Sequence, residues 1–229
     1  PVRGDQGAAR ESGRAGVRAQ AAASRHEPVP GRRCLPPPFR DPLRVLQDAV
    51  RLTSSLLADG DRDAHVGAIV HGDIDLELEF MMDKASNAGV YLQGRYEIQM
   101  FDSWGVDPAR VTDCGAIYER WDESRPEGRK GFEGHAPPQN ISKAPGLWQH
   151  FRIEFRAPRF NAEGEKIENA RFKKVIHNGV VIHENVEVSG PTRASAFQDE
   201  KPLGALMIQG DHVPAALRNI SYKAYGCDR

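Results

Sequence analysis

The sequence predicts an all-β fold in which two antiparallel sheets pack face to face. From residue 66 onward, short segments alternate apolar and polar residues, the period of two that marks a half-buried strand. An Asn-Gly pair separates two apolar runs, as in a tight hairpin between antiparallel strands. No long segment of helical periodicity lies between these strands. The apolar sides of two such sheets are therefore expected to bury each other.

The first strands along the chain are the most regular. In residues 74–80 (IDLELEF) every second residue is apolar and the three between them are acidic, so the apolar side faces a core. In residues 95–100 the same alternation divides the side chains between the two faces of one strand. The set that faces the core comprises Tyr96, Ile98 and Met100, and the opposite set comprises Arg95, Glu97 and Gln99.

The second half of the chain continues the pattern. Residues 151–156 (FRIEFR) repeat the alternation of apolar and charged residues. Asn178-Gly179 predicts a type I′ turn, because that turn needs a positive φ at both central residues. A last pair of strands, over residues 206–209 and 217–222, flanks a polar loop.

Composition limits the function classes. The 229 residues carry a net charge of -1, which does not suggest the clustered basic face of a nucleic-acid-binding protein. No apolar run reaches the length of about 18 residues that a membrane span needs. The three cysteines (Cys34, Cys114 and Cys227) are widely spaced and form no metal-binding motif. We therefore expect neither a nucleic-acid partner nor a membrane partner.

Residues 1–65 differ from the rest. They are rich in arginine, alanine, glycine and proline, contain no lysine, and include one aromatic residue, Phe39. Such a segment buries too little apolar area to offset the entropy of ordering, so we expect a poorly ordered or aberrant N-terminal segment. One short helix is predicted over residues 43–58, where apolar residues recur at helical spacing. These are Leu43, Leu46, Val50 and Leu57.

Six strings from residue 72 onward resemble one known family, in its order. They are GDIDLELEF, SNAGVYLQGRYEIQMFDSWG, DCGAIYERWDE, APPQNISKAPGLWQHFRIEFRAPRF, KVIHNGVVIHENVEVSGPTR and PLGALMIQGDHVPAALRNI. The sequence resembles the 3-keto-disaccharide hydrolase family, formerly a domain of unknown function. The resemblance implies a concanavalin-A-like β-sandwich (jelly roll) in residues 66–229, with a concave face that binds a carbohydrate. It also implies activity on glycosides with a ketone at C3, and a periplasmic or extracellular location, although the N-terminal residues show no apolar signal-peptide core.

The implied substrate defines the chemistry to look for. A ketone at C3 acidifies the proton on C2, and the glycosidic oxygen on C1 is then a β leaving group. Removal of the C2 proton and expulsion of that oxygen, followed by addition of water, cleaves the glycoside. Such a site needs a base, an electrophile for the enolate oxygen, and an acid for the leaving group. One divalent metal ion is a candidate for the electrophile.

The strand over residues 95–102 is the richest candidate. Glu97 is a candidate base or metal ligand, and Gln99 and Arg95 are candidate substrate-binding residues. Asp102 lies at the strand end, where a bulge would turn it to the side of Glu97. The plainer interpretation is a solvated strand face whose charges pair with each other.

The loop that begins at Gln209 is the second candidate. Asp211 and His212 place a carboxylate and an imidazole between two strands, with Gln209 as a substrate-binding residue. Histidine transfers protons near neutral pH and is a frequent metal ligand, so His212 is a candidate for both roles. The plainer interpretation is a polar turn capped by Asp211.

Aromatic residues and further histidines supply the walls of a binding site. Trp148 is a candidate for stacking on a sugar ring, although an indole in an all-β domain is more often a core residue. Tyr118 and His135 lie in a loop-rich stretch and are candidate substrate-binding residues. His177 and His183 flank the Asn-Gly hairpin and are interpreted as structural.

Three functions remain open on the sequence alone. The first is a lyase-like hydrolase of 3-keto-glycosides with Glu97, Asp102, Asp211 and His212 as catalytic residues. The second is a laminarinase-like retaining glycosidase that uses Glu97 and Asp102, although the amide of Gln99 stands where such enzymes carry a central acid. The third is a non-catalytic carbohydrate-binding module.

Overall fold

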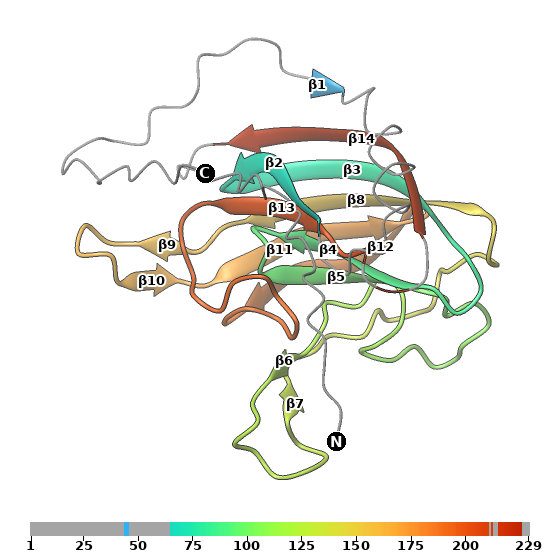
Figure 1. Cartoon of the computed structure of the whole chain (residues 1–229), viewed down its shortest axis with the longest axis horizontal. Helices are drawn as coiled ribbons and strands as arrows, with labels where there is room; N and C mark the ends of the chain where they lie inside the picture. Colours follow the sequence, from blue (N-terminus) through green and yellow to red (C-terminus); the bar gives the residue numbers. More distant parts are fainter. Residues whose placement is uncertain (1–43, 46–64, 211, 213–214, 226–229) are drawn as a thin grey trace, which may run out of the picture. The chain divides into compact units, whose positions relative to one another are not determined.

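The described part of the chain consists of strands and loops only (Figure 1). The computed structural model describes residues 44–45, 65–210, 212 and 215–225. The chain divides into two compact units, 1–33 and 34–229, and all described residues belong to the second. This confirms the all-β class, and no helix that could span a membrane occurs in the described ranges.

The larger sheet has six strands in the order β1-β14-β3-β8-β11-β12, all paired antiparallel. Its strands are β1 (Arg44–Val45), β14 (Ala215–Tyr225), β3 (Asp73–Met82), β8 (Trp148–Arg156), β11 (Ala170–His177) and β12 (Val180–Val188). In β3 each second residue is fully buried, as the alternation in the sequence predicts. Figure 1 shows these long strands side by side.

The smaller sheet has four strands in the order β2-β13-β4-β5. Its strands are β2 (His65–His71), β13 (Gly204–Ile208), β4 (Asn87–Leu92) and β5 (Tyr96–Phe101). Beyond β5 the ladder continues through two isolated bridges, Ile98 with Ile117 and Ile117 with His135. The edge of β5 is therefore covered by the chain around Ile117.

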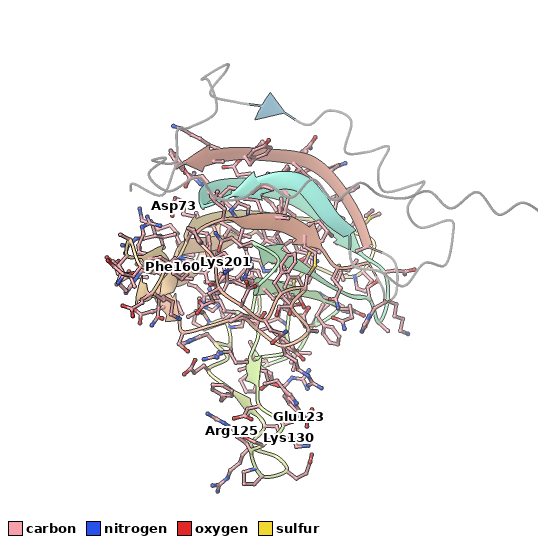
Figure 2. All side chains as sticks on the ribbon, turned by 60° about the vertical axis from the view of Figure 1, so that its left-hand side comes forward. Asp73, Glu123, Arg125, Lys130, Phe160 and Lys201 are labelled. Atoms are coloured by element: carbon pink, nitrogen blue, oxygen red, sulfur yellow. The ribbon has the colours of Figure 1, made fainter. Side chains whose placement is uncertain are left out.

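Two short ribbons project from the sheets. They are formed by β6 (Arg120–Trp121) with β7 (Gly131–Phe132), and by β9 (Arg159–Phe160) with β10 (Lys166–Glu168). In Figure 2, Glu123, Arg125 and Lys130 lie near the tip of the β6–β7 ribbon. There the Lys130 ammonium lies 2.9 Å from the Glu123 carboxylate, and the Arg125 guanidinium lies 3.6 Å from the centre of the Phe132 ring.

A single apolar core joins the two sheets. The Tyr96 ring of the smaller sheet lies 5.3 Å from the Phe155 ring of the larger one, and Phe155 in turn contacts Phe172. Phe80 and Phe151 stack at 4.6 Å on neighbouring strands. Each of these fully buried rings stabilises the fold by about 1.5–3 kcal/mol through loss of exposed apolar surface.

The chain crosses from one sheet to the other at Gly72, between β2 and β3. The His71 ring accepts a hydrogen bond from the Gln93 backbone amide at 3.0 Å. On the other side of Gly72, the Asp73 carboxylate accepts hydrogen bonds from the Ala157 amide (2.9 Å) and from the Arg159 guanidinium (2.7 and 2.8 Å). These bonds fix the corner, because both ring nitrogens of His71 and both carboxylate oxygens of Asp73 have partners.

The predicted strands are present with small changes in their ends. The Asn178-Gly179 turn has φ values of 50° and 86°, as a type I′ turn requires. The strands predicted over 206–209 and 217–222 both form, but they lie in different sheets, as β13 and β14. In the range 43–58, Arg44 and Val45 are strand instead of the predicted helix, and the remaining residues lie outside the described part. Residues 1–43 also lie outside it, so the expectation for that segment stays a prediction.

Candidate functional site

The register of β5 separates its apolar and polar residues. Tyr96, Ile98 and Met100 are fully buried between the two sheets. Glu97 and Gln99 therefore point to the outer face of the smaller sheet. Although they face away from the core, Glu97 is only 2% exposed and Gln99 only 4%. A carboxylate and an amide are thus held out of water on this face.

Antiparallel pairing arranges the outer face of the smaller sheet in two rows that cross the strands. The first row contains Met207, Tyr91, Glu97 and Tyr118, and the second contains Gln209, Gly89, Gln99 and Ala116. We call these eight residues the polar face. Three of the four side chains in the first row are titratable, whereas in the second row the side-chain amide of Gln99 stands between two small residues.

Gly89 makes room for the Glu97 carboxylate. A Cβ atom added to Gly89 would lie 2.2 Å from Glu97 Oε1 and 2.9 Å from its carboxyl carbon. The carboxylate therefore lies directly over the Gly89 backbone, in space that any other residue would fill. A glycine inside a strand commonly marks such a close approach.

Tyr118 reaches the same face because its segment adds to the edge of β5. The Tyr118 backbone amide donates to the Glu97 backbone carbonyl at 3.2 Å, and the Gln99 backbone amide donates to the Ala116 carbonyl at 2.9 Å. Ile117, between them, is buried in the core. Burial raises the pKa of the Tyr118 hydroxyl, and the negative charge of Glu97 raises it further.

Thr192 and Arg193 complete this part of the face. The Thr192 hydroxyl accepts a hydrogen bond from the Glu97 amide at 3.2 Å and donates to the Arg95 carbonyl at 3.0 Å. Arg193 is exposed, and its guanidinium lies 3.7 Å from the centre of the Trp121 ring. Its positive charge opposes the rise in the pKa of Tyr118. A cation thus lies beside Tyr118 at the edge of the polar face.

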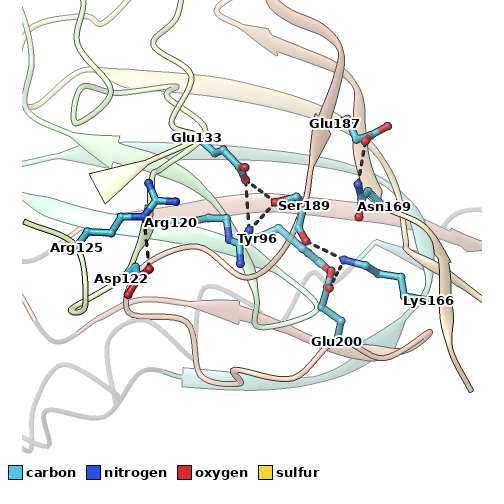
Figure 3. A network of polar contacts seen from close by, with 10 residues as sticks. All are labelled: Tyr96, Arg120, Asp122, Arg125, Glu133, Lys166, Asn169, Glu187, Ser189 and Glu200. Carbon is cyan, nitrogen blue, oxygen red and sulfur yellow. Dashed lines mark hydrogen bonds and ion pairs between the residues drawn. The ribbon is translucent and has the colours of Figure 1, made fainter. Parts of the chain in front are cut away.

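The loop that carries Thr192 is anchored at both ends by polar contacts (Figure 3). The Tyr96 hydroxyl donates to Glu200 at 2.6 Å, and Glu200 pairs with Lys166. The Lys166 ammonium also donates to the Ser189 carbonyl at 2.8 Å. These contacts hold the loop over one end of β5, so Thr192 and Arg193 have defined positions.

Arg95 belongs to this loop anchor. Its guanidinium donates to the Gln93 carbonyl at 2.9 Å and to the Asp199 carboxylate at 2.8 Å, and it lies 4.9 Å from the centre of the Phe197 ring. Only 4% of Arg95 is exposed. The structure therefore gives Arg95 a structural role in place of the predicted contact with substrate.

Asp102 does not join Glu97 as predicted. Asp102 Oδ2 accepts a hydrogen bond at 2.9 Å from the backbone amide of Ala85, which has a positive φ of 61°. Asp102 follows Phe101, the last residue of β5. At the usual rise along a strand, the Cα atoms of residues 97 and 101 already lie roughly 13 Å apart. Asp102 therefore stabilises the β3–β4 turn, and the pair required for a retaining glycosidase, with carboxyls about 5–5.5 Å apart, is not formed.

Trp148 and His135 also lie away from the polar face. Trp148 pairs with Met81 on the outer face of the six-stranded sheet, where the Arg218 guanidinium lies 3.8 Å from the centre of its ring. His135 is bridged to Ile117 and so shares the core side of that ladder. Sequence spacing does not reveal which sheet, or which side of it, receives a residue, so the substrate-binding roles of Trp148 and His135 stay predictions.

The structure describes two of the three residues predicted in the loop that begins at Gln209. The Gln209 backbone amide donates to the Gly89 carbonyl at 2.9 Å, and this pairing places Gln209 on the polar face. His212 is exposed in the loop between β13 and β14. Asp211 lies outside the described residues.

The predicted metal ligands do not form a complete site within the described ranges. No group of three or more histidine, cysteine, aspartate or glutamate side chains that could hold an ion occurs there. Glu97 and His212 alone provide two donors, fewer than metal sites built from protein ligands normally use. The metal ion therefore stays a prediction, with Glu97 and His212 as its candidate ligands.

Sequence reasoning missed several residues of this face. Gly89, Thr192 and Arg193 were not among the candidates, although each falls within one of the six family-like strings. The only sequence signal for Gly89 was a glycine in an otherwise apolar strand. Thr192 and Arg193 follow a Gly-Pro pair far from β5 in the sequence, so only the fold brings Thr192 to Glu97 and Arg193 to Tyr118.

Comparison with known families identifies the domain. A family model described as the 3-keto-alpha-glucoside-1,2-lyase-like domain matches residues 54–223. The chain belongs to this family. As a 3-keto-alpha-glucoside-1,2-lyase-like domain, it is a carbohydrate-processing protein whose substrate is a sugar. No curated protein matches the chain.

Comparison with solved structures finds further proteins similar to this lyase-like domain. A protein of Parabacteroides distasonis ATCC 8503, provisionally called a glycosyl hydrolase, is 25% identical over 70% of this chain and 67% of its own, with a TM-score of 0.55. Two further structures from that organism bear the same description. One is 21% identical over 71% of this chain and 84% of its own (TM-score 0.46). The other is 13% identical over 70% and 73% (TM-score 0.47).

Proposed function

We propose that this domain cleaves glycosides that carry a ketone at C3 of the sugar ring, by removal of the C2 proton and elimination across C1 and C2. The observation that carries the proposal is the Glu97 carboxylate over Gly89, with Tyr118 beside it and Arg193 at the edge. A base, a hydroxyl and a cation thus lie on one face, and these are the three groups that the elimination requires.

In the first step Glu97 takes the proton from C2. The electron pair of the C2–H bond forms a double bond between C2 and C3, and the carbonyl pair moves to the C3 oxygen. Arg193 donates hydrogen bonds to the enolate oxygen that results. Because Glu97 is only 2% exposed, the side chains around it must move to admit the sugar, and Arg193 then exchanges its position beside Tyr118 for a contact with the ketone.

In the second step the enolate collapses. The C3 carbonyl re-forms, a double bond forms between C1 and C2, and the bond from C1 to the leaving oxygen breaks. Tyr118 supplies the proton to that oxygen, since its raised pKa keeps the hydroxyl protonated. Water then adds its oxygen to C1, Glu97 returns its proton to C2, and the second water proton restores Tyr118. The net reaction is hydrolysis.

His212 is a second candidate acid in this proposal, and Asp211 stays a predicted catalytic residue. His212 follows Gln209 by three residues, so the exposed loop that carries it starts from the polar face. An imidazole there is a second candidate for the acid that protonates the leaving oxygen. Substitution of His212 by alanine separates the two candidates, because loss of the true acid lowers the rate most for a poor leaving group.

The test compares one glycoside with and without the ketone. Purified protein is incubated with a 3-keto-α-glucoside and with the parent α-glucoside, and released sugar is measured. Cleavage of the keto compound alone supports the proposal. Cleavage of the parent would indicate an ordinary glycosidase, and binding of either without cleavage would indicate a carbohydrate-binding module. A parallel assay in EDTA tests the predicted metal: an unchanged rate removes the metal-ligand roles of Glu97 and His212.

A further inference from the structure

Two amide side chains of the smaller sheet have buried oxygens with no protein partner. Within the described part of the chain, neither Gln99 Oε1 nor Asn87 Oδ1 accepts a hydrogen bond, and both atoms are out of contact with solvent. Gln99 as a whole is 4% exposed. A buried amide oxygen without a hydrogen-bond donor lowers the stability of the fold by about 1–3 kcal/mol. A ligand that donates hydrogen bonds to these two oxygens would remove that cost.

The two amides lie close together on the polar side of β4 and β5. Gln99 is directly opposite Gly89, and Asn87 is directly opposite Phe101. Asn87 and Gln99 are therefore diagonal neighbours across the strand pair, with Cα atoms about 7–8 Å apart. Two hydroxyl groups of one sugar ring can span that separation.

The neighbours of Gln99 in its row provide no side-chain hydrogen-bond donor for its amide oxygen. Gly89 on one side has no side chain, and Ala116 on the other has only a methyl group. No charged side chain stands in this row of the polar face, which contains Gln209 as its remaining member. The row thus offers neutral amides, which suit hydroxyl groups and not a charged or apolar group.

The position of the amides relative to Glu97 indicates which part of the substrate they meet. On one side of Glu97, β5 is covered by the loop that anchors Arg95, through Thr192 and Asp199. Along β5, a substrate centred on Glu97 therefore extends toward Gln99 and not toward Arg95. That row lies two residues along β5, about 6–7 Å away, which is one sugar ring beyond the group that loses its proton.

We infer that Gln99 and Asn87 form a subsite that reads the hydroxyl groups of the leaving group, so that a polyhydroxylated leaving group is favoured over an apolar one. This inference rests on the proposed function for the placement of the keto ring over Glu97. Specificity for the leaving group is then set by hydrogen-bond acceptors that the protein itself does not satisfy. A leaving group without donors binds less well, because these acceptors stay unpaired.

The experiment uses two substrates and three variants of the full chain. The substrates are 3-keto-α-glucosides whose leaving groups are glucose and phenol. The variants are Gln99→Met, Asn87→Ala and, as a matched control in an exposed loop, Gln198→Met. We expect the first two to lower kcat/KM about five- to tenfold for the glucose compound and less than twofold for the phenyl compound. The control should change neither value.

Stability provides a readout that a merely structural role would not match. Loss of an unpartnered buried oxygen should leave the unfolding midpoint of Gln99→Met equal to or above that of the parent protein. Equal losses of kcat/KM on both substrates, or no loss on either, would overturn the inference while leaving the proposed function intact. If the parent protein cleaves neither compound, the proposed function fails. Calorimetric titration with the glucose compound then decides the inference, which requires weaker binding by Gln99→Met and unchanged binding by Gln198→Met.

Discussion

The charged residues on the outer faces of the two sheets differ in their exposure to solvent. On the six-stranded sheet, the Arg152 guanidinium lies 3.5 Å from the Glu77 carboxylate and 3.6 Å from that of Glu154, and Arg152 and Glu77 are about half exposed. On the four-stranded sheet, Glu97 is 2% exposed and lies over a glycine. The first face is a solvated surface, and the second removes a carboxylate from water.

The difference in burial has an energetic meaning. Exposed ion pairs such as that of Arg152 contribute about 0–1 kcal/mol, so their loss is tolerated. Removal of a carboxylate from water costs several kcal/mol before its partners are counted. A domain that keeps Glu97 in such a place gives up stability there, as active sites commonly do. Three predictions probe this contrast.

The largest effect is expected from Glu97→Gln. The amide has the shape of the carboxylate but cannot accept the C2 proton, so the rate on a 3-keto-α-glucoside should fall by about 10²–10⁴-fold. Glu77→Gln, the same change on the solvated face, should leave the rate unchanged and alter the free energy of unfolding by less than about 1 kcal/mol. Similar rates for the two variants would remove Glu97 from the mechanism.

Gly89→Ala should have the next largest effect. The new Cβ would stand 2.2 Å from Glu97 Oε1, so the carboxylate must move. A displacement of about 1 Å costs on the order of 10²-fold in rate. Gly164→Ala is the control: its φ is +84° and no atom lies within 4 Å of the added Cβ, so it should cost about 1–2 kcal/mol of stability and no activity. Full activity of Gly89→Ala would show that the position of Glu97 is not critical.

Buried histidines extend the contrast to stability against pH. Burial lowers the pKa of His71 to about 4, that of His177 to about 3 and that of His183 to about 4, from 6.5. The unfolded chain therefore binds protons below pH 6.5 that the folded chain does not, and stability falls as the pH drops from 6.5 toward 4. At pH 5 the loss is roughly 2 kcal/mol for each histidine.

Urea unfolding at pH 7, 6 and 5 measures this loss. His183 Nε2 lies 2.8 Å from the Gly115 carbonyl, and His183→Gln keeps a donor there while it removes one titrating group. The variant should lose about a third less stability between pH 7 and pH 5 than the parent. An equal loss in both proteins would show that His183 is not protonated preferentially in the unfolded chain.

Strand positions were predictable because their cause is local. The alternation in residues 74–80 and the two sets of side chains on β5 follow from the period of two in any strand, and both appear in the structure. The Asn178-Gly179 turn was likewise predictable, since positive φ values restrict the residues that fit. The division of β13 and β14 between two sheets was not, because alternation says nothing about a strand's partner.

The candidate site was predictable only for the residues of one strand and its nearest neighbours. Glu97, Gln99, Tyr118 and Gln209 were named from the sequence and lie on the polar face. Asp102, Trp148 and His135 were also named and lie elsewhere. They differ from the first group in the strand or turn against which the fold places them, and the sequence does not reveal that placement.

By itself, the sequence determined the all-β class, the facing of the residues on β5 and the family, because each depends on residue order within short segments. Only the tertiary structure decided that Gly89 lies under the Glu97 carboxylate, that Thr192 bonds the Glu97 backbone amide from 95 residues away in the chain, and that Arg95 anchors a loop. The physical reason is that these contacts arise from the pairing and packing of distant strands, which local periodicity does not encode.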